Sequence, residues 1–110
     1  MPYDEDLAVR IRELTAGEDG VSEQRMFGGL AFLVHGNMAV AASGKGGIML
    51  RCEPDETDQL VEQTAASPMV MRGRPAHGWV RVAADELTAR GALEGWVERG
   101  VAYARSLPAK

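Results

Sequence analysis

The chain has 110 residues, of which 45% are hydrophobic and 25% charged, and sixteen acidic against twelve basic residues give a formal net charge of −4. This balance indicates one soluble globular domain over residues 1–110 and excludes a generally basic nucleic-acid binder. The single cysteine excludes an intramolecular disulfide and a cysteine-rich zinc site, and no apolar run approaches the roughly 20 residues that span a bilayer. A secretory signal begins with basic residues followed by an apolar stretch, whereas residues 3–6 of this chain are a tyrosine and three acids. We therefore expect a cytoplasmic protein without a membrane segment.

The first segment has the pattern of an amphipathic helix. Acidic residues 4–6 stand where negative charge stabilises a helix N-terminus. Four apolar residues then recur at spacings of four, four and three, which places them on one helical face: Tyr3, Leu7, Ile11 and Leu14. We expect this helix to end before Gly17.

Between residues 21 and 53 the spacing of apolar residues becomes that of strands. Three breaks divide this stretch, namely Gly28-Gly29, Gly36-Asn37 and residues 43–47. A Gly-Asn pair between two apolar runs predicts a two-residue hairpin turn, because such turns need residues that tolerate positive φ. The pattern therefore predicts a four-strand antiparallel meander.

The hairpin predicted around Gly36-Asn37 is apolar on both faces. One face would hold Ala31, Leu33, Met38, Val40 and Ala42, and the other Leu30, Phe32, Val34, Ala39 and Ala41. An antiparallel sheet with one face in water carries polar residues there, so something must cover each face, either helices on both sides or a second subunit. Because soluble monomers rarely leave a large apolar patch open, we expect a twofold homodimer.

The second half of the chain predicts a helix, two strands and a final helix. Pro54 suits the first position of a helix, and short strands over residues 69–71 and 79–82 flank a loop over residues 73–78. The last helix is the clearest element, because its apolar residues keep helical spacing: Leu93, Trp96, Val97, Val101, Ala104 and Leu107. We expect the indole of Trp96 to be buried. Segregated helices and antiparallel strands predict a two-layer α+β domain.

No complete catalytic constellation is readable in the sequence. It lacks the Gly-x-Ser-x-Gly elbow and the spacing of a phosphate-binding loop, and neither His35 nor His77 lies in a metal-binding motif. Cys52 ends a predicted strand and is interpreted as a small buried apolar residue. We therefore expect a protein without enzymatic activity, metal or cofactor.

The best candidate for a binding site is the basic stretch over residues 72–81. It contains Arg72, Gly73, Arg74 and His77, and Arg25 could join it. Arginines offer planar, bidentate donors to carboxylates and phosphates, and glycine lets backbone N–H groups approach a ligand closely. The alternative is that these arginines pair with the acidic residues between positions 53 and 68.

Residues 25–32, Arg-Met-Phe-Gly-Gly-Leu-Ala-Phe, resemble the N-terminal domain of the TfoX/Sxy family. The similarity continues through residues 36–40, the Gly-Arg-Pro and Gly-Trp-Val segments of residues 73–80, and the last helix. It implies a two-layer α+β fold similar to secretion-chaperone folds and a relation to regulators of natural competence, here as a stand-alone domain without the C-terminal domain that such regulators often carry. It supplies no catalytic residues.

Three functions follow as hypotheses. The first is a non-catalytic regulatory module that binds a protein partner. The second is a small-anion or metabolite binder, conceivably an enzyme, that uses the basic stretch; a concave pocket lined by its residues would favour this hypothesis. The third, direct DNA binding, is disfavoured by the net charge of −4.

Overall fold

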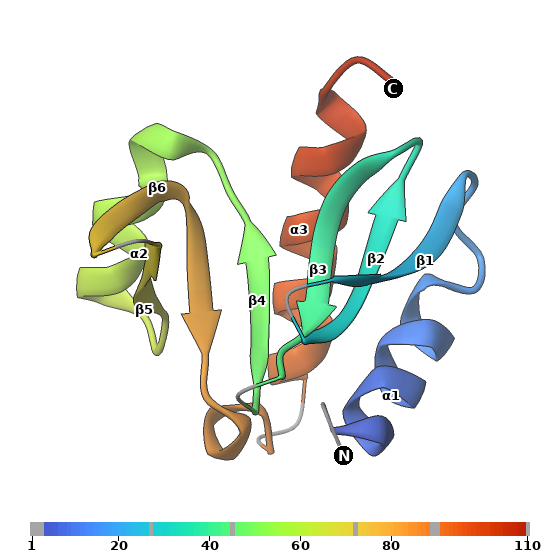
Figure 1. Cartoon of the computed structure of the whole chain (residues 1–110), viewed down its shortest axis with the longest axis horizontal. Helices are drawn as coiled ribbons and strands as arrows, with labels where there is room; N and C mark the ends of the chain where they lie inside the picture. Colours follow the sequence, from blue (N-terminus) through green and yellow to red (C-terminus); the bar gives the residue numbers. More distant parts are fainter. Residues whose placement is uncertain (1–3, 27, 45, 72, 89–90, 110) are drawn as a thin grey trace.

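The computed structural model describes residues 4–26, 28–44, 46–71, 73–88 and 91–109. The elements in chain order are α1 (Glu5–Thr15), β1 (Val21–Met26), β2 (Gly29–Val34), β3 (Asn37–Ala42), β4 (Ile48–Arg51), the 3₁₀ turn η1 (Pro54–Glu56), α2 (Thr57–Gln63), β5 (Ser67–Met71), β6 (Arg74–Val82), the 3₁₀ turn η2 (Ala84–Leu87) and α3 (Ala92–Ser106). Figure 1 shows this arrangement. The predicted order of one helix, four strands, a helix, two strands and a helix is confirmed.

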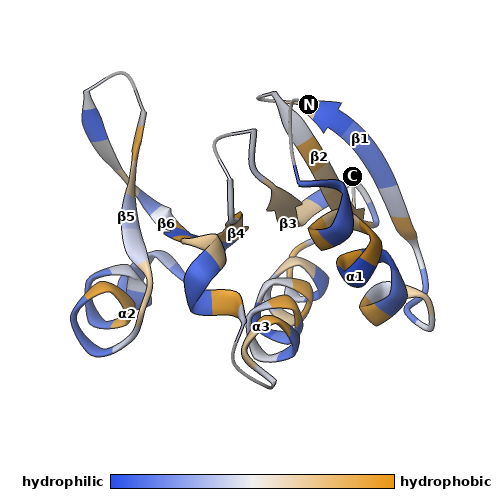
Figure 2. Ribbon diagram, turned by 90° about the horizontal axis from the view of Figure 1, so that it is seen from below, coloured by the Kyte–Doolittle hydropathy of each residue, from blue (hydrophilic) through white to orange (hydrophobic). Residues whose placement is uncertain are grey.

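The six strands form one antiparallel sheet in the order β1-β2-β3-β4-β6-β5. In Figure 2 the three helices lie on one side of this sheet, and the β5–β6 hairpin and β1 extend toward the other side. The predicted two-layer α+β architecture is therefore confirmed. No helix among the described parts of the chain is long and apolar enough to cross a membrane.

The main core lies between the sheet and the helices. Asp4 caps α1 by accepting a hydrogen bond from the backbone N–H of Leu7 at 3.1 Å, which satisfies one of the free donors at a helix start. Each helix buries one face against the strands, and the largest fully buried side chains include Ile11 of α1, Leu93 of α3 and Phe32 of β2. Burial of this apolar surface is the principal stabilising contribution to the fold.

The turn of the β2–β3 hairpin lies one residue earlier than predicted. His35 and Gly36 both have positive φ, at 50° and 85°, as a type I′ turn requires, and Asn37 is the first residue of β3. The register also shifts between Phe32 and Leu33. This register shift, rather than the displaced turn, makes the predicted faces wrong in part: Val40 and Ala42 pack in the main core, and Ala41 packs on the opposite face.

Three further expectations are corrected by tertiary packing. The predicted loop over residues 73–78 is largely strand, because β6 begins at Arg74. Leu14 is exposed, and α1 buries Ala8 and Thr15 beside its predicted core residues. Trp96 is only half-buried against the main core, so the cost of truncating it is expected to be below that of a fully buried side chain. Tyr3 lies outside the described residues.

The Gly-Gly pair in the family-like segment has a structural cause. Gly28 has a φ of 73° in the turn before β2, and a Cβ atom on Gly29 would lie 2.1 Å from the carbonyl oxygen of Ala42. No side chain fits at that distance, so the close approach of β2 to the end of β3 requires glycine.

Candidate functional site

The face of the sheet that carries no described helix has its own apolar cluster, here called the methionine face. Five of its residues are buried, namely Ala31, Leu33, Met38, Ala41 and Met49, and three partly buried residues pack against them, namely Met26, Met69 and Trp79. Four of the six methionines in the chain belong to this face. Methionine is unbranched and its sulfur is polarizable, so such a surface adapts readily to different contacts.

The centre of the methionine face is already closed within one chain. Its five central residues are each at most 9% exposed, although all three helices pack on the other side of the sheet. The alternative that helices cover both faces is therefore wrong, whereas cover by a second subunit stays a prediction. Partial exposure is confined to the surrounding Met26, Met69 and Trp79, and these side chains are the accessible apolar part of the face.

Two arginines share the methionine face with these apolar side chains. The strand register places Arg81 opposite Met49 and Arg51 opposite Trp79, and residues directly opposite each other on antiparallel strands point to the same side. The guanidinium carbon of Arg51 lies 5.6 Å from the ring centre of Trp79 and 5.8 Å from that of Tyr103. These cation–π distances indicate that the Arg51 guanidinium is held between Trp79 of β6 and Tyr103 of α3.

No acidic residue of the described strands lies on the methionine face. The single acidic residue within β1–β6 is Glu23, which pairs with Phe32 and so belongs to the helix-covered side. There it accepts hydrogen bonds from Arg12 at 2.6 and 2.8 Å. The hydrogen bond from Arg12 holds the pKa of Glu23 below its usual value. The methionine face thus combines apolar and cationic groups without a compensating carboxylate from its own strands.

The structure distributes the predicted binding residues rather than gathering them at one point. Arg25 is in β1, at one edge of the sheet, whereas Gly73 and Arg74 lie at the β5–β6 end of the strand order. His77 contacts Asp58 of α2, with 3.5 Å between Nε2 and Oδ1. Arg72 lies outside the described residues.

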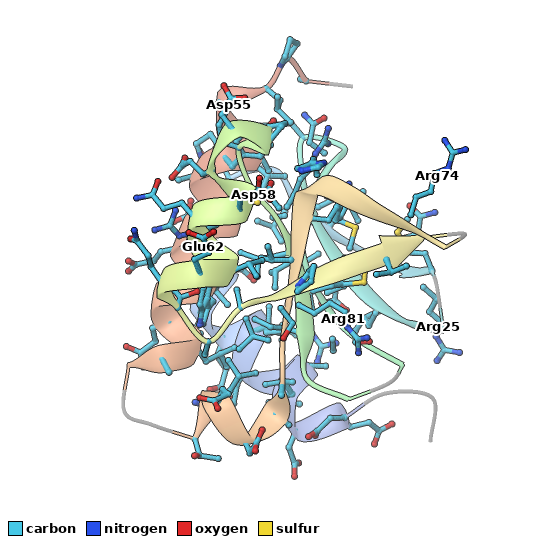
Figure 3. All side chains as sticks on the ribbon, turned by 90° about the vertical axis from the view of Figure 1, so that its left-hand side faces the viewer. Arg25, Asp55, Asp58, Glu62, Arg74 and Arg81 are labelled. Atoms are coloured by element: carbon cyan, nitrogen blue, oxygen red, sulfur yellow. The ribbon has the colours of Figure 1, made fainter. Side chains whose placement is uncertain are left out.

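Arg25, Arg74 and Arg81 make no ion pair with any acid in the described ranges, whereas ion pairs are made by Arg12, Arg99 and Arg105. Figure 3 shows why the predicted alternative does not apply to Arg74. Its side chain and those of Arg25 and Arg81 lie away from α2, which carries Asp58 and Glu62 on the opposite side of the molecule. These three arginines are therefore separated in space from the acidic residues of α2.

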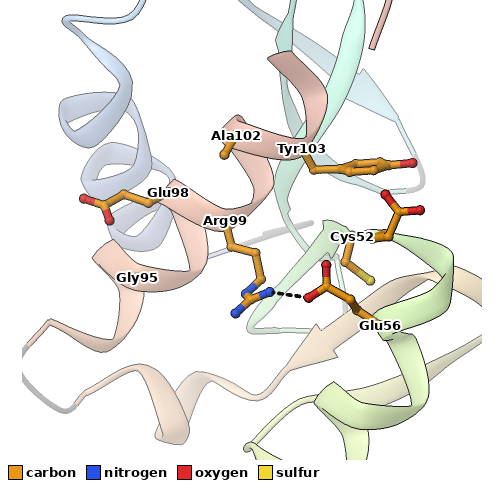
Figure 4. Close-up of a pocket in the computed structure, with 8 residues that line it drawn as sticks. Cys52, Glu56, Gly95, Glu98, Arg99, Ala102 and Tyr103 are labelled. Carbon is orange, nitrogen blue, oxygen red and sulfur yellow. Dashed lines mark hydrogen bonds and ion pairs between the residues drawn. The ribbon is translucent and has the colours of Figure 1, made fainter. Parts of the chain in front are cut away.

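A separate cleft of about 510 Å³ lies between α3 and the segment that joins β4 to α2 (Figure 4). Its lining residues are Cys52, Glu53, Glu56, Gly95, Glu98, Arg99, Ala102 and Tyr103. The side chains of Arg99 and Glu56 approach to 3.4 Å across it. The cleft carries three carboxylates and one guanidinium, so its charge is opposite to that of the methionine face.

Cys52 is the potential nucleophile in this cleft. The sulfur of Cys52 lies 3.7 Å from the hydroxyl oxygen of Thr57. The residue as a whole is 1% exposed. Burial raises the pKa of the Cys52 thiol, with a smaller opposing effect of Thr57, so the group is a neutral thiol at neutral pH. Within the part of the chain that the structure describes, no group of three His, Cys, Asp or Glu side chains could hold a metal ion.

Three residues define the methionine face chemically, namely Arg51, Trp79 and Arg81. The sequence interpretation missed Arg51, and it included Trp79 and Arg81 in the basic stretch without recognising the face that they share. The available signal was the alternation within β4 and β6, where every second residue belongs to the helix-free side. That signal becomes decisive only when the pairing of β4 with β6 is known, because the two strands are separated by α2 and β5 in the chain.

Comparisons with known proteins bear on the family of the chain. Comparison with curated proteins and with solved structures gave no match. A family model described as the TfoX N-terminal domain matches residues 13–104, a range that includes all six strands and α2 and most of α3. This range is most of the chain and contains the Met-Phe-Gly-Gly segment on which the resemblance rested. The chain belongs to the TfoX N-terminal domain family.

Proposed function

We propose that this chain is a non-catalytic interaction module of regulatory type, related to the regulators of natural competence, which binds a protein partner in the cytoplasm. Membership of the TfoX N-terminal domain family supports the regulatory class. The observation that carries the proposal is the methionine face, where accessible Met26, Met69 and Trp79 lie beside arginines and no strand carboxylate.

The composition of this face suits protein recognition. Tryptophan, methionine and arginine are enriched in protein interfaces, and tryptophan and arginine account for much of the binding energy there. The buried centre holds the surrounding side chains on a sheet rather than on mobile loops. A partner would therefore meet a prearranged surface and would lose less conformational entropy on binding.

The cleft beside Cys52 supports a non-catalytic role. A cysteine nucleophile reacts as the thiolate, whereas burial favours the neutral thiol of Cys52. The side chain also packs in the main core, where its role is structural. Small-anion binding by the predicted residues has less support, because His77 is paired with Asp58 and Arg25 lies at the other end of the strand order.

Site-specific photo-crosslinking in the source cells tests this proposal. A photo-reactive phenylalanine analogue replaces Gln24, which is exposed and lies opposite Ala31 on the methionine face. The matched control places the same group at Gln63, an exposed glutamine of α2 on the helix side. We expect one or a few proteins to be crosslinked through position 24 and not through position 63.

Two results would contradict the proposal. Crosslinking of nucleic acid in place of protein would indicate a nucleic-acid binder. Equal protein recovery from positions 24 and 63, or recovery from neither, would show that the methionine face has no specific protein partner.

A further inference from the structure

The charges around the methionine face specify the chemistry of its partner. We propose that this face binds an acidic segment of the partner protein, in which apolar side chains alternate with aspartate or glutamate residues. This inference rests on the proposed function and adds to it the class of the bound segment.

Arg74 and Arg81 lie on a different side of this acidic chain from the acidic residues of α2. The net charge is −4, yet the methionine face carries Arg51 and Arg81 and no acid from its own strands. Asp58 and Glu62 lie on α2, on the opposite side of the molecule from Arg74 (Figure 3). An acidic segment is therefore repelled by the helix side and attracted to the methionine face, which favours both encounter and orientation.

The guanidinium groups of Arg74 and Arg81 are available to bind a carboxylate. The described ion pairs use other cations, such as Arg12, Arg99 and Arg105. Arg74 is exposed and Arg81 is half-buried, and neither forms an ion pair with a described acid. An arginine without a carboxylate partner offers a planar pair of N–H donors that matches an incoming aspartate or glutamate.

The partly buried apolar side chains of the methionine face would also contribute to binding. Met26, Met69 and Trp79 are only partly buried and border a centre of closed apolar side chains. A purely acidic segment would leave this surface in water, whereas leucine or phenylalanine side chains would cover it. Burial of apolar area stabilises a complex, so the segment that fits best carries both kinds of side chain.

The same features disfavour two other occupants. A second copy related by a twofold axis would bring together two identical faces that carry arginines and no strand carboxylate to pair with them. Single-stranded nucleic acid binds through several aromatic rings on which bases stack, and Trp79 is the aromatic residue that the described part of this face provides. Methionines supply apolar contact rather than such a stacking platform.

Peptide binding to the full chain tests the inference. The probe is a short fluorescent peptide in which leucine and phenylalanine alternate with pairs of aspartate or glutamate, and the control peptide has lysine in place of every acid. Fluorescence anisotropy measures affinity, and isotope-labelled methionine methyl groups report the location by NMR. We expect the acidic peptide to bind and to shift the methyl signals of Met26 and Met69, and the lysine peptide to show no binding.

Charge-reversal variants test the role of the arginines. Arg74→Glu and Arg81→Glu should each weaken binding of the acidic peptide by about tenfold or more. Arg10→Glu makes the same charge change on the exposed side of α1 and should change affinity far less. Because Arg81 is half-buried, the methionine spectrum of each free variant verifies folding, and the exposed Arg74 provides a second variant that packing does not affect.

The inference would be overturned by equal binding of both peptides, by equal loss in the Arg10→Glu variant, or by unmoved methyl signals on binding. A single-stranded oligonucleotide that shifts the same methyl signals more strongly than the acidic peptide would also overturn it. If the acidic peptide fails to bind while position 24 still crosslinks a protein, the segment chemistry is wrong and the proposed function stands. If the peptide binds but position 24 crosslinks no protein, the proposed function fails.

Discussion

The side-chain oxygen of Thr57 accepts a hydrogen bond from the backbone N–H of Gly78 at 2.8 Å, across 21 positions of the chain. Gly78 in turn accepts a hydrogen bond through its carbonyl oxygen from the backbone N–H of Cys52, also at 2.8 Å. Thr57 is the first residue of α2 and is buried. These two bonds join the end of β4, the start of α2 and the middle of β6, the strand that carries Trp79 and Arg81.

Replacement of Thr57 by valine tests this junction. Valine keeps the shape of threonine but provides no acceptor, so the buried N–H of Gly78 loses its partner. An unsatisfied buried donor costs about 1–3 kcal/mol, and we expect a loss of that size in the free energy of unfolding measured with urea. Thr57→Ser keeps the hydroxyl and should lose less. A valine variant as stable as the original chain would contradict this account.

Two glycines of α3 should respond in opposite directions to alanine. A Cβ atom on Gly100 would lie 2.6 Å from the carbonyl oxygen of Ala39 in β3, so Gly100→Ala must push the helix away from the sheet. Overpacking of this kind costs typically about 1–3 kcal/mol. A Cβ atom on Gly95 would meet nothing within 4 Å, and Gly95→Ala should stabilise the helix by up to about 1 kcal/mol.

Thermal and urea unfolding of both single variants measure this contrast. The two substitutions are chemically identical and lie in the same helix, so each is the control for the other. Equal effects of the two changes would show that helix propensity alone decides stability at both positions, and that the close contact between α3 and β3 does not.

The sequence predicted the order of elements because local signals agree with the fold. The apolar spacing of α3 persists around Leu93, Val97 and Val101, and turn residues separate the strands of the meander. The turn was misplaced by one residue because both His35-Gly36 and Gly36-Asn37 are plausible turns, but that displacement keeps the same side chains on each face. The faces escaped prediction because the register shifts between Phe32 and Leu33, and an extra residue in one strand moves the side chains beyond it to the other face. A histidine with the left-handed φ of 50° that His35 adopts is uncommon. The residue types therefore favoured Gly36-Asn37 as the turn, which is not the pair that forms it.

The candidate site was predicted less well than the fold because it depends on pairing between distant strands. Arg74 was recognised from its basic neighbourhood, and the structure leaves it without an ion pair among described acids. His77 was assigned to the same site, but Asp58 of α2 approaches it, and no local pattern indicates that contact. Arg51 escaped notice because its position opposite Trp79 follows from the β4–β6 register.

Cys52 should make stability depend on alkaline pH. Burial raises the pKa of its thiol in the folded chain, so the folded state holds this proton more tightly than the unfolded state. The resulting stabilisation is fully present below the unfolded pKa of about 8.5 and is lost as the pH rises through the folded pKa. We expect the free energy of unfolding to fall above roughly pH 8.5 more steeply than in Cys52→Ala.

The reactivity of Cys52 gives an independent measurement of the same property. At neutral pH a thiol-specific reagent should modify the folded chain far more slowly than the chain in denaturant, because the thiol is both buried and protonated. Rapid modification under native conditions, or a pH profile identical to that of Cys52→Ala, would show that the thiol is accessible and that its pKa is not raised.

The state of association of the chain depends on whether the methionine face is covered by a second copy. The sequence pattern favoured a twofold dimer because both faces of the β2–β3 hairpin are apolar, and the dimer stays a prediction of that pattern. The structure supplies reasons for a monomer: Leu33, Met38 and Met49 are already buried within one chain, and a twofold contact through the methionine face would bring together two faces that carry arginines and no strand carboxylate. We therefore expect light scattering at micromolar concentration to give a mass near 11.8 kDa. A mass near twice that value, reduced to that of one chain by Arg81→Glu or Arg74→Glu, would instead establish the dimer and place its interface on the methionine face.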